Sequence, residues 1–137
     1  MKFVLDSSVA AKWVLPESDS AEALSFRDDL RNKIHESIAP DIFPVEIGHA
    51  ISKAERQGRV SKADGFSLWT EVMADCPQLF HYLPLMSRAY ALSSRARIGV
   101  YDCLYVALSE QEQCQVLSAD QRLMNAFSGH VVPLWSV

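Results

Sequence analysis

The stretch MKFVLDSSVAAKW, residues 1–13, decides the fold. Residues 3–5 form a short apolar run, which ends at the ionisable residue Asp6. A short, continuously apolar run followed at once by turn-forming polar residues is typical of a parallel strand covered on both faces. We therefore predict a buried strand at residues 2–5. Asp6 is then the unusual feature, because it adds a carboxylate to the end of a core element.

Apolar runs alternate with helical patterns along the whole chain. Further strands are predicted at residues 37–39, 80–83, 116–119 and 130–134. Helices are predicted after Asp6 to near Pro16, from Asp19 to about Lys33, from Asp41 to Gly58, from Ser61 to before Pro77, and over 85–96, 100–112 and 120–127. This alternation favours right-handed crossovers. We expect an α/β fold, a three-layer α/β/α sandwich with a parallel sheet of about five strands. Pro133 cannot donate to a ladder, so the last strand should lie at an edge.

Length and composition are those of an ordinary globular protein. The 137 residues are 49% hydrophobic and 22% charged, so we expect a single domain over residues 1–137. No segment approaches the roughly 20 apolar residues that span a bilayer, and we expect a cytoplasmic protein without membrane contact. The three cysteines lack CxxC spacing and are expected to be buried apolar residues.

Four acidic residues lie in segments that must pack in the core: Asp6, Glu46, Asp102 and Asp120. Each has an alternative explanation when taken singly. Asp6 and Asp120 follow strands and could cap the next helix, and Asp102 falls in a first helical turn, where an anion is favoured. Glu46 lies on the flank of an apolar helical stripe and is harder to explain in this way.

These four acids are expected to converge, because two follow strands and two begin helices on the same side of the sheet. Two carboxylates about 4 Å apart repel by roughly 4 kcal/mol at an effective dielectric near 20, so the cluster requires protons or cations. Ligands that are all oxygen select Mg²⁺ or Mn²⁺ over zinc. A metal held in this way suits phosphodiester hydrolysis. Glu46 would ligate or orient the nucleophilic water, and the metal ligands would be Asp6, Asp102 and Asp120.

The net charge of −4 argues mildly against a nucleic-acid partner, but its distribution changes the argument. With the four acids set aside, 13 acids remain against 13 Lys and Arg, so a metal-loaded protein would be nearly neutral. Ser8 and Ser118 are close in sequence to Asp6 and Asp120 and are expected to support them through hydroxyl hydrogen bonds. The residues suggested for phosphate contacts are Lys12, Arg95, Arg97 and Arg122.

The segments VLDSSVAAKWVLPE, IAPDIFPVEIGHAI, VYDCLYVAL and VLSADQRL, in this order, resemble the PIN-domain ribonucleases, and in size the VapC-type toxins of toxin–antitoxin pairs. By this resemblance the four acids occupy the family's metal site, Ser8 its small hydroxyl position, and Ser118 a position where Thr is common. It also implies RNA as substrate, Mg²⁺ or Mn²⁺ as cofactor, homodimerisation and an antitoxin partner. The antitoxin groove would include Trp13 and Trp69, although core packing is the preferred explanation for either tryptophan.

The sequence therefore predicts a metal-dependent endoribonuclease. Asp6 and Asp102 would hold the principal metal, and Asp120 would complete that site or help to hold a second ion. Two alternatives remain. One is a noncatalytic PIN-like module that binds RNA or protein, and the other is a DNA-directed nuclease of the same chemistry.

Overall fold

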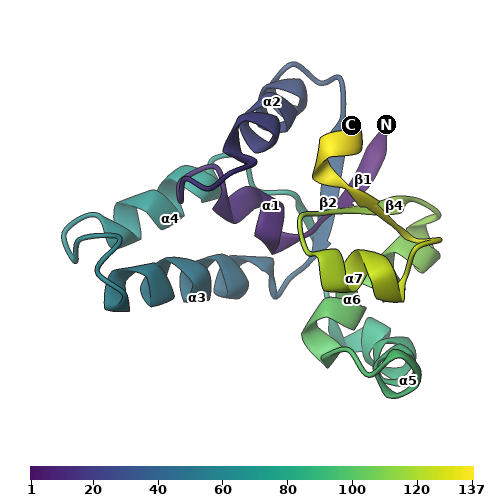
Figure 1. Cartoon of the computed structure of the whole chain (residues 1–137). Coiled ribbons are helices and arrows are strands. Elements are labelled where there is room, and N and C mark those ends of the chain that lie inside the picture. The colour runs from purple at the N-terminus through teal and green to yellow at the C-terminus, as the bar shows by residue number, and fades with distance from the viewer.

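The computed structural model describes residues 1–137 and contains one five-stranded sheet between two layers of helices (Figure 1). The strands are β1 (Lys2–Leu5), β2 (Glu36–Pro40), β3 (Gln78–Phe80), β4 (Gln115–Ser118) and β5 (Val131–Pro133). The helices are α1 (Ser7–Ala11), α2 (Ser20–Arg31), α3 (Phe43–Arg56), α4 (Gly65–Met73), α5 (Met86–Ala96), α6 (Val100–Glu112) and α7 (Gln121–Ala126). Short 3-10 segments lie at η1 (Leu83–Leu85) and η2 (Leu134–Ser136). The predicted α/β/α sandwich is confirmed.

All strand pairs are parallel, and the strand order is β3-β2-β1-β4-β5. The chain moves outward from β1 to β3 and then returns across the sheet to β4 on the other side of β1. The order therefore reverses between β1 and β4, and in open α/β sheets such a point marks the functional crevice at the carboxyl ends of the strands. The last strand, β5, lies at an edge, as Pro133 predicts.

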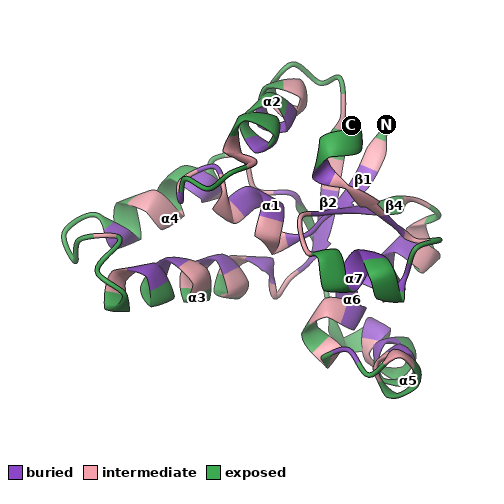
Figure 2. Cartoon of the chain, viewed as in Figure 1, coloured by how far each residue is buried: buried purple, intermediate pink, exposed green.

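The core is densest around the two central strands. Val4 and Leu5 in β1 are fully buried, as are Val116 and Leu117 in β4. These strands are covered on both faces, which explains their continuous apolar runs. Figure 2 shows the buried residues of the helices facing this sheet. The residue directly after each apolar run therefore lies at the carboxyl edge of the sheet, in a position fixed by the buried strand.

The third strand ends earlier than the sequence predicts. The structure places β3 at Gln78–Phe80, and the predicted strand at 80–83 is wrong beyond Phe80. The Asp41 carboxylate accepts a hydrogen bond from the Tyr82 backbone N–H at 3.0 Å, which turns the chain away from the sheet. Pro84 then lies in the 3-10 segment η1, so the apolar residues after Phe80 belong to a turn.

Helices α3 and α4 form an arm that projects from the sheet (Figure 1). Its two helices pack together, and the Trp69 indole N–H donates to the Pro44 carbonyl at 2.9 Å. Trp69 is partly buried there, whereas Trp13 is a core residue that donates to the Ala23 carbonyl at 3.0 Å. Core packing therefore accounts for Trp13 and removes it from any surface groove. None of the helices has the length and apolar character needed to cross a bilayer.

Truncation of Leu117 should weaken the fold strongly, because its side chain is fully buried beside the central strand. Leu117→Ala should lower the free energy of unfolding by about 2–5 kcal/mol. Gln115→Ala, at an exposed position of the same strand, is the matched control and should change it by less than about 0.5 kcal/mol. Denaturant unfolding measures both changes, and equal effects of the two substitutions would contradict this account of the core.

Candidate active site

Asp6 lies at the carboxyl end of β1 and is almost completely buried, with 4% of its surface exposed. Its Oδ2 accepts hydrogen bonds from the hydroxyls of Ser8 and Ser118, each at 2.7 Å. Asp6 occupies the N-cap position of α1, but its side chain caps no backbone N–H. The helix-cap explanation is therefore wrong for Asp6. The structure instead brings it together with both predicted supporting serines.

The environment of Asp6 disfavours its charged form. Burial raises the pKa of Asp6 from 3.8 to about 7, and the nearby carboxylates of Asp102 and Glu46 contribute to the rise. The hydrogen bonds from Ser118 and Ser8 oppose this effect without cancelling it. Because three carboxylates influence one another here, the predicted convergence of Asp6, Glu46 and Asp102 is visible in the electrostatics. A carboxyl group with these neighbours loses its proton more easily when a cation binds beside it.

Glu46, in the first turn of α3, is held by two hydroxyls that sequence analysis did not assign to the site. Its Oε1 accepts hydrogen bonds from the Tyr105 phenol at 2.6 Å and from Ser7 Oγ at 3.3 Å. Burial raises the pKa of Glu46, the Tyr105 hydrogen bond lowers it, and Asp102 raises it again. Tyr105 follows Asp102 by three residues on α6 and so lies on the same helical face. The spacing indicates the helical face on which Tyr105 lies, but not that its hydroxyl reaches Glu46.

Asp102 and Asp120 both lie next to one cationic side chain, that of Arg122. Asp102 Oδ2 lies 3.1 Å from Arg122 Nη2, and Asp120 Oδ2 lies 3.9 Å from the same atom. Burial raises the pKa of Asp102, Asp120 raises it further, and Arg122 opposes both. Asp120 is also a helix cap, since its Oδ1 accepts from the backbone N–H groups of Arg122 and Leu123. Asp120 can therefore cap α7 and lie close to Asp102 at the same time.

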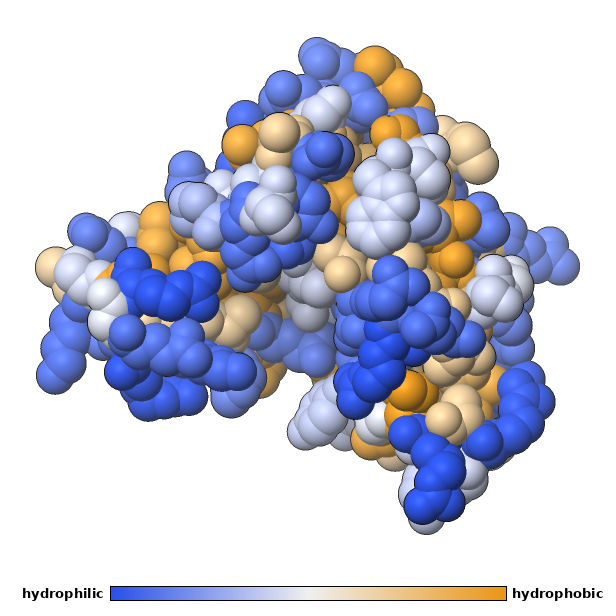
Figure 3. Space-filling view, in the orientation of Figure 1, coloured by the Kyte–Doolittle hydropathy of each residue, from blue (hydrophilic) through white to orange (hydrophobic).

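Two of the four acids, Glu46 and Asp120, line a hollow of about 760 Å³. Its lining residues come from α1, α3, α6 and the N-cap of α7: Ser7, Val45, Glu46, His49, Ala50, Lys53, Tyr101 and Asp120. Figure 3 shows the surface hollowed between the α3–α4 arm and the α6 and α7 helices. His49 and Lys53 follow Glu46 along α3 and are exposed. Two basic side chains therefore line the same hollow as two of the acids.

The predicted phosphate contacts lie in different environments. Lys12 is engaged by Glu17 and by Asp19, the latter at 2.9 Å, and only 11% of its side chain is exposed. The structure therefore does not support Lys12 as a phosphate contact, because its charge is already neutralised. Arg95 and Arg97 are exposed at the end of α5 and form no ion pair. Arg122 is at the acids themselves.

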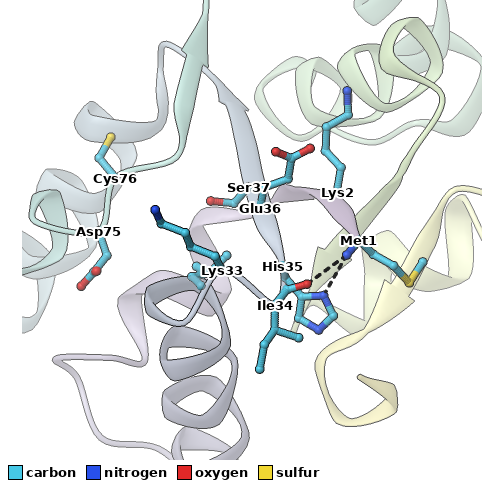
Figure 4. A pocket seen from close by; sticks show the side chains of 10 residues that line it. Met1, Lys2, Lys33, Ile34, His35, Glu36, Ser37, Asp75 and Cys76 are labelled. Atoms are coloured by element: carbon cyan, nitrogen blue, oxygen red, sulfur yellow. Dashed lines mark hydrogen bonds between the residues drawn. The ribbon is translucent and has the colours of Figure 1, made fainter.

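A second cavity, of about 560 Å³, lies at the amino edge of β1 and β2 (Figure 4). Its charged groups are largely paired. The Met1 amine donates to the Ile34 carbonyl at 3.2 Å, Lys2 contacts Glu112 at 3.4 Å, and Asp75 accepts from Arg27 at 2.8 Å. Asp75 has a lowered pKa despite its partial burial, because Arg31 and Arg27 donate to it. The carboxyl edge, where acids outnumber cations, is therefore the stronger candidate for chemistry.

The donor set at the carboxyl edge fits a hard divalent cation. No group of three or more His, Cys, Asp and Glu side chains is gathered closely enough to hold a metal ion. Mg²⁺ does not require such a cage, since it usually retains several waters and binds through one or two carboxylates. Asp6 and Asp102 would supply oxygen ligands to such an ion, and the mutual repulsion of the acids would favour its binding.

Stability should depend on pH through Asp6. The folded protein keeps the Asp6 proton up to about pH 7, whereas the unfolded chain releases it near pH 3.8. Between these values the folded state binds more protons, so stability falls as pH rises through the window, by about 4 kcal/mol in all. In EDTA at about pH 8, Asp6→Asn should therefore unfold at higher denaturant concentration than wild type. The free energies of unfolding of the two proteins should become equal near pH 4. A variant less stable than wild type at pH 8 would contradict this origin of the Asp6 pKa shift.

Removal of the Tyr105 hydroxyl should act on Glu46. Because the Tyr105 hydrogen bond lowers the pKa of Glu46, Tyr105→Phe should raise that pKa further and reduce stability by about 1–3 kcal/mol. Carboxyl-carbon NMR titration and denaturant unfolding measure the two effects. Tyr101→Phe, on the same helix with an exposed ring, is the control and should change neither.

Comparison with known proteins gives a consistent result. The PIN domain family model matches residues 3–127, which include all four acids. The chain is 26% identical to Ribonuclease VapC3 from Pyrobaculum aerophilum over 135 residues, covering 97% of this chain and 100% of that protein. The crystal structure of PAE2754 from Pyrobaculum aerophilum superimposes with a TM-score of 0.71 at 17% identity, covering 99% of this chain and 94% of that one. The chain belongs to the PIN domain family.

Proposed function

We propose that this protein is a VapC-type endoribonuclease that requires Mg²⁺ or Mn²⁺, and that it is the toxin of a toxin–antitoxin pair. The observation that carries the proposal is Asp6, a buried carboxylate at the carboxyl end of the central strand. Its charged form has no cationic side chain beside it, and Asp102 and Glu46 disfavour it further. A divalent cation supplies the missing countercharge.

Residues 1–137 form one PIN domain that acts in the cytoplasm.

Each acid has a role in this proposal. Asp6 and Asp102 hold the principal metal, and Asp120 completes its shell or helps to hold a second ion. A bound Mg²⁺ or Mn²⁺ lowers the pKa of a water molecule and stabilises negative charge on the attacked phosphodiester. Glu46 orients this water through Oε2, which has no protein partner, while Tyr105 and Ser7 fix Oε1. In-line attack leaves 5′-phosphate and 3′-hydroxyl ends.

Single-stranded RNA is the substrate that the hollow suits. Lys53 and His49 supply positive or polar groups for phosphates, and the exposed ring of Tyr101 can stack on a base. The similarity to Ribonuclease VapC3 favours RNA over DNA. Cleavage of matched RNA and DNA oligonucleotides distinguishes these two substrates.

A second copy of the chain covers an exposed apolar surface beside the active site. Tyr82 and Leu83 are 38% and 60% exposed, and Tyr82 lines a mainly apolar hollow of about 390 Å³ together with Ile42 and Met86. An isologous contact through this surface would bring two active sites near each other. The homodimer implied by the family resemblance is consistent with this surface, and light scattering tests it.

The antitoxin is proposed to bind at the junction of α3 and α4. Phe66 is 75% exposed and stacks on Trp69, with ring centroids 5.3 Å apart. These rings line a hollow of about 270 Å³ together with Ile51 and the backbone of Gly48 and Gly65. An apolar side chain of a partner segment would fit between the helices, so Trp69 remains a candidate groove residue.

Cleavage of single-stranded RNA should depend on both the metal and the acids. Asp6→Asn and Asp102→Asn should each reduce cleavage by more than about 100-fold, since loss of outer partners of metal ligands already costs about 10- to 100-fold. EDTA should abolish cleavage, and Mn²⁺ should restore it. Asp28→Asn, an exposed acid on α2, is the control and should cleave normally.

This experiment also separates the enzyme from a noncatalytic PIN-like module. A binding module would retain RNA or protein binding, show no metal-dependent cleavage, and gain no stability from Mg²⁺. Full cleavage by Asp6→Asn, or full cleavage in EDTA, would refute the metal mechanism.

A further inference from the structure

Arg122 is the only cationic side chain paired with any of the four acids. Its Nη2 lies 3.1 Å from Asp102 Oδ2 and 3.9 Å from Asp120 Oδ2. Asp6 and Glu46 are bonded to hydroxyls instead. The guanidinium therefore provides the positive charge at the outer two acids in this structure.

The backbone and side chain of Arg122 are held very differently. Its backbone N–H donates to Asp120 Oδ1 at 2.9 Å, which anchors the residue to the helix cap. Its side chain is 65% exposed, and exposed ion pairs of this kind contribute little to stability. The guanidinium can thus leave the carboxylates while the residue remains beside them.

We propose that Arg122 is an exchangeable counter-cation, which neutralises Asp102 and Asp120 in the metal-free protein and is displaced onto an RNA phosphate when a divalent cation binds. The inference rests on the proposed metal-dependent function. Arg122 and the divalent ion compete because both are attracted to the Asp102 carboxylate, and also to Asp120 where this residue completes the metal shell. A displaced guanidinium remains next to Asp120, which lines the hollow that a phosphate would enter.

This exchange gives Arg122 opposite effects on two ligands. Before the metal binds, the guanidinium occupies carboxylate oxygens that a divalent ion would use. After the metal binds, the same guanidinium is free, and its planar donors match a phosphate group. Removal of Arg122 should therefore strengthen metal binding and weaken RNA binding. A residue with only a structural role would not shift the two affinities in opposite directions.

The first measurement is metal binding to the full chain. Calorimetric titration with Mg²⁺ should give an affinity for Arg122→Gln about two- to fivefold higher than for wild type, which corresponds to the loss of an exposed ion pair. Arg122→Lys retains a charge without the planar fork and should lie between them. Arg56→Gln, an exposed arginine on α3, is the matched control and should bind like wild type.

The second measurement is the salt dependence of RNA binding at saturating Mg²⁺. The KM of Arg122→Gln for a single-stranded oligonucleotide should rise, and the slope of log KM against log salt should decrease by about 0.7, the loss of one phosphate contact. An Mg²⁺ affinity of Arg122→Gln equal to or below that of wild type, or an unchanged KM, would overturn this role alone. Wild-type protein that binds no Mg²⁺ would overturn the metal-dependent function and this role together.

Discussion

The structure of the site depends on the burial of one carboxylate between two hydroxyls. Asp6 Oδ2 accepts from Ser8 and Ser118 at 2.7 Å, and these two donors come from different segments of the chain. Ser118 reaches Asp6 because β1 and β4 are paired with Leu5 opposite Leu117. A slip of one residue in this register would turn Ser118 away and leave the carboxylate with a single donor. The pairing of β1 with β4 therefore fixes the position of the Asp6 carboxylate.

The four acids are compensated in different ways according to their depth. The buried Asp6 and the half-buried Glu46 receive neutral hydroxyl donors, whereas Asp102 and Asp120, nearer the surface, receive the Arg122 guanidinium. A guanidinium would lose much hydration at the depth of Asp6, while a hydroxyl loses little. Hydroxyl donors add no positive charge, so the ionised carboxylates of Asp6 and Glu46 still lack a counter-cation. Asp102 and Asp120 already have a counter-cation, the Arg122 guanidinium, which can move away from them.

Local sequence was sufficient for most of the fold because burial on both faces gives β1 and β4 short, continuous apolar runs. The carboxyl ends of parallel strands share an edge, so the positions of Asp6 and Asp120 just beyond the ends of β1 and β4 also followed from sequence. The end of β3 did not, because it depends on a hydrogen bond from Tyr82 to Asp41, 41 residues earlier in the chain. The pairing of Lys12 with Asp19 was unpredictable for a similar reason, since it depends on how the loop after α1 folds back.

Tyr105 illustrates a different limit of prediction. It falls in the apolar stripe of α6 and is fully buried, so its pattern is that of any core aromatic residue. Only its hydroxyl, 2.6 Å from Glu46, distinguishes it, and periodicity carries no information about where one polar atom at the end of a ring lies. A buried Tyr must nevertheless find a partner for its hydroxyl. In a core whose other large buried side chains are apolar, a carboxylate at the rim is a natural acceptor, and the same contact that satisfies the phenol fixes the acid.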